Sequence, residues 1–266
     1  MTITRKIWLA VSLAATVLVC TSMAGANQTG IDPYWRAALA YEKFRDTHFS
    51  DKHCEAGNNY FGCVDGEDGR PIGAYGDFGN SLGAELALGL RPHPVWRVEL
   101  ALGGQTNMKF KGNANFLGAG ERQPVTGDAS QVRLFTMNYI DIAPLLKIDL
   151  GAFQPFVGAG IGMARNKIKT MTYAFPEFQN QPSYTTVPGD SHWNMMWTLS
   201  AGTAIRIMPR SFIDLAYSYS DYGWMQTADN QIDVARGWGS VTRFSVEPTR
   251  AKLRSQGILM GFRHHF

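Results

Sequence analysis

The amino-acid sequence predicts an all-β protein: an eight-stranded antiparallel transmembrane up-and-down β-barrel. Three observations support this prediction. The chain begins like a secreted protein, it contains eight alternating or apolar runs joined in turn by long and short segments, and it ends on an alternating strand with a terminal aromatic residue. In a membrane barrel, lipid-facing and lumen-facing side chains alternate because successive residues of a strand point to opposite faces. A soluble sandwich strand shows the same alternation, so the prediction depends on the three observations together.

Residues 1–26 have the organisation of a secretory signal peptide. Arg5 and Lys6 precede an apolar stretch over 7–19, and Ala24-Gly25-Ala26 forms an A-x-A cleavage site. The apolar stretch is too short for a membrane-spanning helix. We therefore expect export of the chain and removal of this segment.

The mature chain, residues 27–266, is expected to form one barrel domain with four long extracellular loops. The full sequence carries 25 Lys and Arg against 22 Asp and Glu. Two of the basic residues leave with the signal, so the mature net charge is about +1. This charge gives no reason to expect nucleic acid as a partner. No mature segment approaches the roughly 20 consecutive apolar residues of a transmembrane helix, so a membrane-spanning form has to be a barrel.

The cysteines predict one disulfide. Cys20 leaves with the signal, and the residues before it lack the leucine and the small residue of a lipidation signal. Cys54 and Cys63 then form a pair in an oxidising compartment. Zinc binding with His48 and His53 is the alternative, but the spacing of paired zinc ligands is missing. We expect no metal and no cofactor.

The eight strands are read from eight runs in chain order. These runs are 34–46, 81–90, 96–110, 132–142, 156–166, 193–208, 212–222 and 253–266. The segments between them alternate between long and short, beginning with the long segment that holds both cysteines. Outer-membrane barrels have long loops outside and tight turns in the periplasm, and an even strand number places both termini in the periplasm.

Alternation assigns the faces of most strands. The residues assigned to lipid are Leu82, Ala84, Leu86, Leu88 and Leu90 in the second strand, Trp96, Val98, Leu100 and Leu102 in the third, and Ile213, Leu215, Tyr217 and Tyr219 in the seventh. The fourth run is apolar on both faces, which leaves its register unassigned and suggests a bulge. In the fifth, Gly158, Gly160 and Gly162 fall on the inner face, where we expect them to make room for bulky lumen side chains.

Aromatic residues at both ends of the runs suggest two interfacial girdles. The first girdle is Tyr34, Trp35, Trp96, Phe156, Phe212 and Phe266, and the second is Phe44, Phe110, Phe135, Trp193, Tyr219 and Tyr222.

The lumen is expected to hold charges of both signs. The predicted set is Arg36, Glu42, Glu85, Arg97, Glu99, Arg206, Asp214, Arg263 and His265. Eight strands enclose an interior just wide enough for side chains to fill. We expect these residues to pair and plug the barrel, because charges removed from water persist when paired. A narrow ion path or proton route is the alternative, since ionisable residues inside a membrane are often functional.

Four segments of the chain resemble one family. These are 34–44, 155–162, 213–219 and 261–266. They resemble the opacity-type outer-membrane β-barrel family of small porin-like surface proteins, which is similar in architecture to the transmembrane domain of outer-membrane protein A. The resemblance covers essentially the whole mature chain and implies location in the bacterial cell outer membrane.

The resemblance also implies an assembly signal in the last strand. The barrel assembly machinery would recognise Phe266 as the terminal aromatic, with Phe262 and His264 along the same face. His264 stands where the family usually has Tyr or another aromatic. Members are described variously as surface antigens, adhesins or porin-like proteins, so the resemblance implies a fold more than an activity.

An enzymatic function is not favoured. A lipid-modifying outer-membrane enzyme would need Ser, His and an acid grouped at the outer leaflet. His264 and His265 lie at the periplasmic end, and Asp190, Ser191 and His192 are sequence neighbours, which seldom form a working triad.

The sequence therefore predicts a non-enzymatic outer-membrane protein with a structural or surface-interaction role. A small passive porin-like channel and, less favoured, a lipid-modifying enzyme are the alternatives. Expected partners are outer-membrane lipid and lipopolysaccharide, the assembly machinery, and a host or surface ligand at the loops. Loop aromatics could bind that ligand or pack on each other; they are Tyr60, Phe61, Phe116, Tyr173, Phe175, Phe178, Tyr184 and Trp238.

Overall fold

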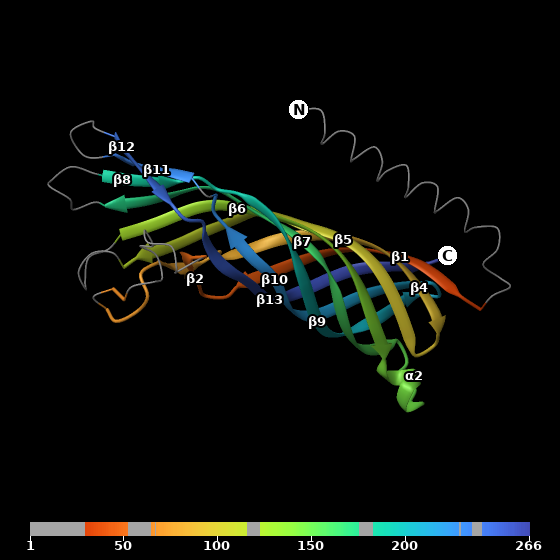
Figure 1. The fold of residues 1–266 in the computed structure, drawn as a ribbon. Coiled ribbons are helices and arrows are strands. Elements are labelled where there is room, and N and C mark those ends of the chain that lie inside the picture. The colour runs from red at the N-terminus through yellow and green to blue at the C-terminus, as the bar shows by residue number, and fades with distance from the viewer. Residues whose placement is uncertain are drawn as a thin grey trace, which may run out of the picture.

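The computed structural model describes residues 30–52, 65–66, 68–115, 123–175, 183–228, 230–235 and 241–266. Long antiparallel strands close into one barrel, which confirms the predicted fold (Figure 1). In ring order they are β1 (Asp32–Phe44), β4 (Asn80–His93), β5 (Trp96–Ala114), β6 (Gln123–Asp141), β7 (Phe153–Phe175), β9 (Ser191–Met208), β10 (Ser211–Gln226) and β13 (Thr249–His265). β13 pairs with β1 from His265↔Tyr34 to Ser255↔Phe44 and completes the ring.

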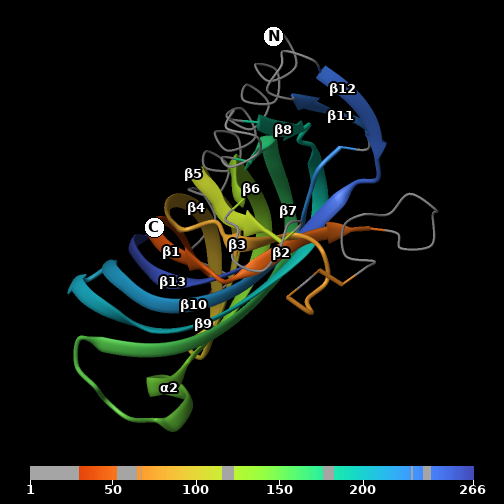
Figure 2. The ribbon, with the colours of Figure 1, turned by 90° about the vertical axis from the view of Figure 1, so that its left-hand side faces the viewer.

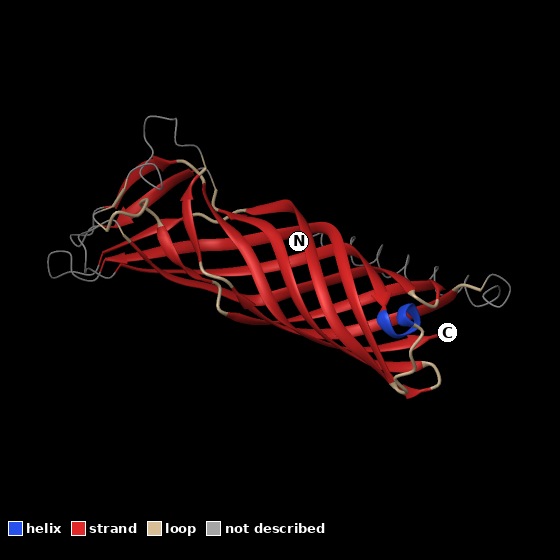
Figure 3. Ribbon diagram, turned by 90° about the horizontal axis from the view of Figure 1, so that it is seen from below, coloured by secondary structure: helices blue, strands red, loops and turns tan. Residues whose placement is uncertain are grey.

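The two ends of the barrel differ. One end contains the start of β1, the end of β13 and the short connections, such as the Pro209-Arg210 turn. We call it the turn end. The connection after β6 contains a helix that the sequence did not predict, α2 (Ile142–Leu146), which ends at Lys147 with φ 55°. The other end, the loop end, carries the long connections. Figures 2 and 3 show α2 and the loop-end strands at opposite ends of the barrel.

Much of the chain expected as loop is β-structure, which corrects the prediction. Further strands lie at the loop end: β2 (Thr47–Asp51), β3 (Ala74–Asp77), β8 (Ser183–Val187), β11 (Asn230–Ala235) and β12 (Val241–Val246). β2 pairs with β13 and β3 pairs with β5, so they continue the wall beyond the ends of β1 and β4. About 9–11 tilted residues cross a bilayer, whereas β7 has 23 residues. The barrel therefore extends well past the thickness of a membrane.

Burial alternates along the strands as predicted. In β4 every second residue from Ser81 to Gly89 is buried, and the leucines between them are exposed. The expected bulge in the fourth run is wrong: from Val132 to Asp141 burial alternates without interruption. The register shifts of β6 lie nearer the loop end, beside Gly127 and opposite Gln105–Met108. Arg133 and Tyr139 consequently face the lumen.

The outer surface carries an apolar belt between the two ends. Its exposed members include Leu39, Tyr41, Leu82, Leu86, Leu100, Leu134, Val157, Ile161, Leu199, Leu215, Tyr217, Ile258 and Met260. A belt of this kind around a closed ring of strands is the surface that a bilayer-spanning barrel presents to lipid.

No helix in the described part of the chain combines the length and apolar character needed to cross a membrane.

The predicted aromatic girdles are only partly present. Trp96, Trp193 and Phe266 are exposed at the strand ends. The other predicted members are mostly buried inside the barrel: Tyr34, Phe44, Phe110, Phe135, Phe156, Phe212 and Tyr222. These seven were assigned by depth along the strand alone, but they lie on the lumen-facing side of the alternation.

Candidate functional site

The best-defined polar assembly in the described chain is the charged interior. Arg36 of β1 lies at its centre, with Nη2 2.6 Å from Oε1 of Glu85 and 2.8 Å from Oε2 of Glu99. Its Nε also donates to Glu99. All three side chains are almost completely buried. Burial of a charge is tolerated when a partner of opposite sign and good geometry compensates the lost hydration.

Arg133 of β6 extends this network toward the loop end. Its Nη1 donates to Oε1 of Glu42 at 2.9 Å and to the Tyr222 hydroxyl at 2.6 Å, and its Nη2 lies 3.5 Å from Glu85. The Tyr222 and Ser255 hydroxyls donate to the other oxygen of Glu42 at 2.8 and 2.6 Å. Glu42 is thus held by three strands besides its own.

Two further ion pairs lie toward the turn end. Arg97 pairs with Asp141 at 3.0 Å, and Arg263 pairs with Asp214 at 3.1 Å. Aromatic rings cover both guanidinium groups: Arg97 lies 4.7 Å from the Tyr139 ring centre, and Arg263 lies 4.5 Å from that of Phe212. Such cation–π contacts stabilise desolvated guanidinium groups.

The structure brings together all but one of the nine residues of the predicted lumen set. Arg36, Glu42, Glu85, Arg97, Glu99, Asp214 and Arg263 are buried in the lumen. Arg206 corrects the prediction: it is exposed at the turn end, where it lines the mouth of the barrel with Arg91 and Arg210. His265 is also buried and joins the network, with Nε2 3.0 Å from Nη1 of Arg263 and Nδ1 2.6 Å from Asp32.

Sequence reasoning missed three members of the network. Arg133 and Asp141 both lie on the fourth strand of the barrel, whose register the sequence left unassigned. Tyr222 was assigned to the second aromatic girdle. Counting in steps of two from Asp141 back to Arg133 would have placed both on one face.

The glycines of β7 make room for lumen side chains. A Cβ at Gly158 would lie 2.5 Å from a ring carbon of Tyr139, one at Gly160 would overlap Met137, and one at Gly162 would overlap Phe135 and the carbonyl oxygen of Leu134. Bulky residues on β6 therefore occupy the space that side chains on β7 would take.

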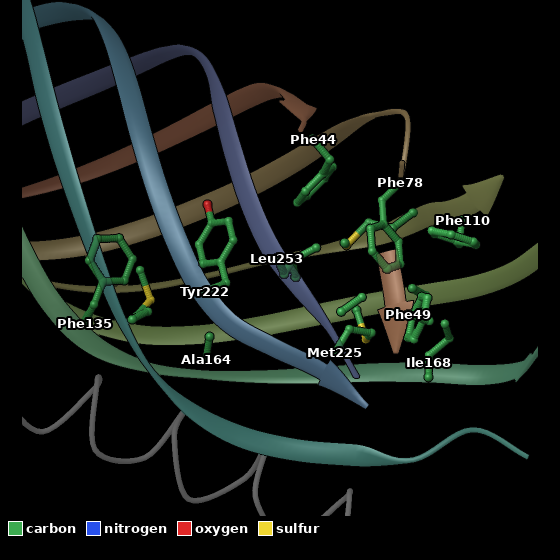
Figure 4. Packing of buried hydrophobic residues seen from close by; sticks show 14 of the residues in the cluster. Phe44, Phe49, Phe78, Phe110, Phe135, Ala164, Ile168, Tyr222, Met225 and Leu253 are labelled. Carbon is green, nitrogen blue, oxygen red and sulfur yellow. The ribbon is translucent and has the colours of Figure 1, made fainter. Parts of the chain in front are cut away.

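Beyond the ion pairs, the interior becomes apolar toward the loop end (Figure 4). Phe49 of β2 has no exposed surface and meets Phe110 edge-on at 5.0 Å between ring centres. Phe78 lies 5.3 Å from Phe110. Met225 and Leu253 are buried in the same cluster. This apolar plug, formed around Phe49, Phe78 and Phe110, lies inside the barrel on the loop-end side of the network.

A small cavity lies between the charges. The cavity beside Arg36, Glu85 and Arg133 has a volume of about 40 Å³. A water molecule needs roughly 10–15 Å³ by this measure, so the cavity has room for about three.

The Ser, His and acid groups that could form a hydrolytic site are not assembled in the described part of the chain. His192 contacts Asp190 at 2.6 Å, but the Ser191 hydroxyl accepts a hydrogen bond from Arg165 at 2.7 Å. At the turn end, Ser211 lies 3.0 Å from His264, without a carboxylate bonded to that ring.

At the loop end, Asp68 organises the segment between β2 and β3. The backbone N–H of Arg70, the Asn115 amide and the Arg70 guanidinium all donate to its carboxylate, and together they lower the pKa of Asp68 to about 2. The hydroxyl of Tyr75 donates to the Pro71 carbonyl, and partial burial raises the pKa of Tyr75.

The predicted assembly residues share one outward face of β13. Phe262 and His264 are partly exposed and pack beside Trp35, at 5.5 and 6.4 Å between ring centres, and Phe266 is exposed.

The signal segment, Cys54, Cys63 and His53 lie outside the described residues. Among the loop aromatics, Tyr173 is buried and Tyr184 is exposed; Tyr60, Phe61, Phe116, Phe178 and Trp238 also lie outside the described residues.

No protein-family model matches the chain, and its sequence matches no curated protein. Among solved structures, it is similar to surface protein A of Neisseria, with a TM-score of 0.44 and 14% identity over 89% of this chain and 97% of the other. It is similar to the outer membrane protein OprG from Pseudomonas aeruginosa, with a TM-score of 0.42 and 15% identity over 88% and 95%. It is also similar to the outer membrane protease OmpT from Escherichia coli, with a TM-score of 0.37 and 6% identity over 88% and 97%. At these scores the similarity carries no argument about function.

Proposed function

We propose that this eight-stranded barrel is an integral protein of the bacterial outer membrane, with a structural or surface-interaction role and without catalysis. The observation that carries the proposal is the apolar belt around a closed ring of strands. In a bilayer every backbone polar group must be paired, and closure of β1 on β13 achieves this without an open edge. The belt contacts outer-membrane lipid and lipopolysaccharide.

In this proposal the turn end faces the periplasm and the loop end faces outward. The barrel assembly machinery reads the outward face of β13 at Phe262, His264 and Phe266. A disulfide joins Cys54 and Cys63 in the first long segment, and the long connections carry the surface for a host or other surface ligand.

The filled interior supports a structural barrel over a passive channel. The ion pairs around Arg36 and Arg133 leave a cavity of about 40 Å³, and the apolar plug lies beyond it. Both layers fill the interior with side chains, which favours a structural barrel over the wide aqueous channel of a porin. The Ser191 hydroxyl accepts a hydrogen bond from Arg165 rather than bonding to His192, which supports a role without hydrolytic chemistry.

The first test is gel mobility of the membrane-extracted protein, heated and unheated, with protease treatment of intact cells. We expect a heat-modifiable band and cleavage confined to the long segments. A soluble protein without a mobility shift would overturn the proposal.

Two further measurements separate the alternatives. Planar-bilayer recordings are expected to show no steady conductance, and open-channel steps would favour the porin-like function. Mass analysis of lipid A from cells with and without the gene is expected to give identical species, and a new species would reveal an enzyme.

A further inference from the structure

The apolar belt ends abruptly on two neighbouring strands. On β13 the outward face passes from Met260 and Ile258, both more than half exposed, to Arg254 and Lys252. On β1 it passes from Leu39 and Tyr41 to Lys43 and Arg45. In both strands the change occurs on the loop-end side of the belt.

Strand pairing brings these cations together. Lys43 lies opposite Gln256, two residues from Arg254, and the backbone N–H of Arg45 donates to the carbonyl of Arg254 at 3.0 Å. Lys43, Arg45, Lys252 and Arg254 are called the basic rim.

The basic rim keeps a surplus of positive charge. Asp221 of β10 contacts both Arg254, at 3.0 Å, and Lys252, at 3.1 Å, so one carboxylate serves two cations. Among the described residues, Lys43 and Arg45 have no carboxylate within ion-pair distance, although exposed Asp46 follows Arg45 in the chain. The side chain of Arg254 remains 47% exposed. These cations are therefore available to a further anion.

An interfacial aromatic residue marks the same level. Trp224 is 38% exposed beside the rim, and the ammonium of Lys252 lies 5.0 Å from the centre of its ring. Tryptophan gathers where acyl chains meet headgroups. The rim thus lies at the depth at which lipid headgroups meet the barrel.

We propose that the basic rim binds the phosphates of lipid A in the outer leaflet. This inference rests on the outer-membrane assignment proposed above, and adds to it a site and a lipid chemistry. Lipid A combines acyl chains, which would lie against Ile258 and Tyr41, with phosphate groups at the level of Arg254 and Lys43. Clustered Lys and Arg at a membrane surface attract anionic headgroups, and guanidinium binds phosphate oxygens through paired N–H donors.

The test is native mass spectrometry of the folded mature barrel in a zwitterionic detergent, titrated with diphosphoryl lipid A. The triple variant K43Q/R45Q/R254Q is expected to bind lipid A at least about tenfold more weakly than the wild type. The Asp221→Asn variant is expected to bind more tightly, because Arg254 and Lys252 lose their shared carboxylate.

The control removes the same number of cations at the opposite end, in K147Q/R206Q/R210Q, and should bind as the wild type does. Equal weakening by this control, or equal binding of dephosphorylated lipid A, would overturn the proposal. Competition by millimolar inorganic phosphate would also overturn it, because it would indicate a site for free anions. A heat-modifiable band from each variant shows that the barrel has folded; loss of that band in the wild type would instead reject the outer-membrane assignment.

Discussion

Arg133 on β6 and Glu42 on β1 form an ion pair across the lumen at 2.9 Å, 91 residues apart in the chain. Neither strand is the neighbour of the other in the ring, since β4 and β5 lie between them. The pair therefore braces walls of the barrel that no backbone hydrogen bond joins. Arg36 of β1 contacts Glu85 of the neighbouring strand β4 and also Glu99 of β5, which is one strand further along the ring.

Removal of one member of this pair should be costly. We expect Glu42→Ala to lower the free energy of unfolding by about 3–5 kcal/mol, because Arg133 is left buried without its nearest carboxylate. Tyr222→Phe removes the hydroxyl that donates to Glu42 and accepts from Arg133 but leaves the ion pair in place, and should cost about 2 kcal/mol. Urea unfolding of the refolded barrel in micelles measures both. A Glu42→Ala variant as stable as Tyr222→Phe would show that the pair contributes little.

The contact between Gly158 and Tyr139 gives a prediction about packing. Gly158→Ala should destabilise the barrel by about 1–3 kcal/mol, because the new methyl group would overlap the tyrosine ring. Addition of Tyr139→Leu should recover part of this loss, since the smaller side chain vacates that space. A double-mutant cycle in the same unfolding assay checks this, and strictly additive losses would contradict the proposed overlap.

The apolar plug should stabilise the loop-end strands β2 and β3 rather than the membrane-spanning part of the barrel. Phe49→Ala removes a fully buried ring, a change that typically costs about 3–5 kcal/mol, and we expect β2 and β3 to detach locally. Proteinase K should then cleave within residues 45–79 faster, while the heat-modifiable band persists. Asp46→Ala, at an exposed position just before β2, is the control and should leave cleavage unchanged. Loss of the band would mean that the plug supports the whole barrel.

The Asp68 contacts should persist into strong acid. The pKa of Asp68 is lowered to about 2, below its ordinary value of 3.8, so its stabilising contribution is complete above pH 4 and is lost as the pH falls toward 2. Carbon-13 NMR of the Asp68 carboxyl group should give a midpoint near 2. Arg70→Gln should raise that midpoint only in part, because the backbone N–H at residue 70 still donates. An ordinary midpoint in the wild type would show that these bonds do not form in solution.

Period-two alternation was enough to predict the belt, because lipid selects apolar side chains on one face of every spanning strand. It failed for the fourth strand, where Phe135, Met137 and Tyr139 make the inner face as apolar as the outer one. Arg133 was missed for that reason. The loop-end strands could not be predicted because their pairing joins segments such as β2 and β13, which lie far apart in the chain.

The pairs across the lumen also escape local reasoning. Which guanidinium group pairs with Glu42 or with Glu85 depends on the stagger of several strands at once. This stagger is a property of the closed ring. Phe156 and Phe212 were misassigned because depth along a strand was read without its parity. Arg206 keeps the inward parity but lies so near the turn end that it reaches solvent.

The pairing of β1 with β13 governs the order in which this chain can fold. The strand synthesised first finds its second neighbour only in the strand synthesised last, and the backbone N–H of Phe266 donates to the carbonyl of Pro33 at 3.0 Å. Vectorial folding during export therefore cannot complete the ring, because a chain truncated before residue 249 leaves β1 and β10 with unpaired edges. The same adjacency makes the protein suited to circular permutation: a short linker could join Phe266 to the residues before Pro33, with new termini opened at the loop end.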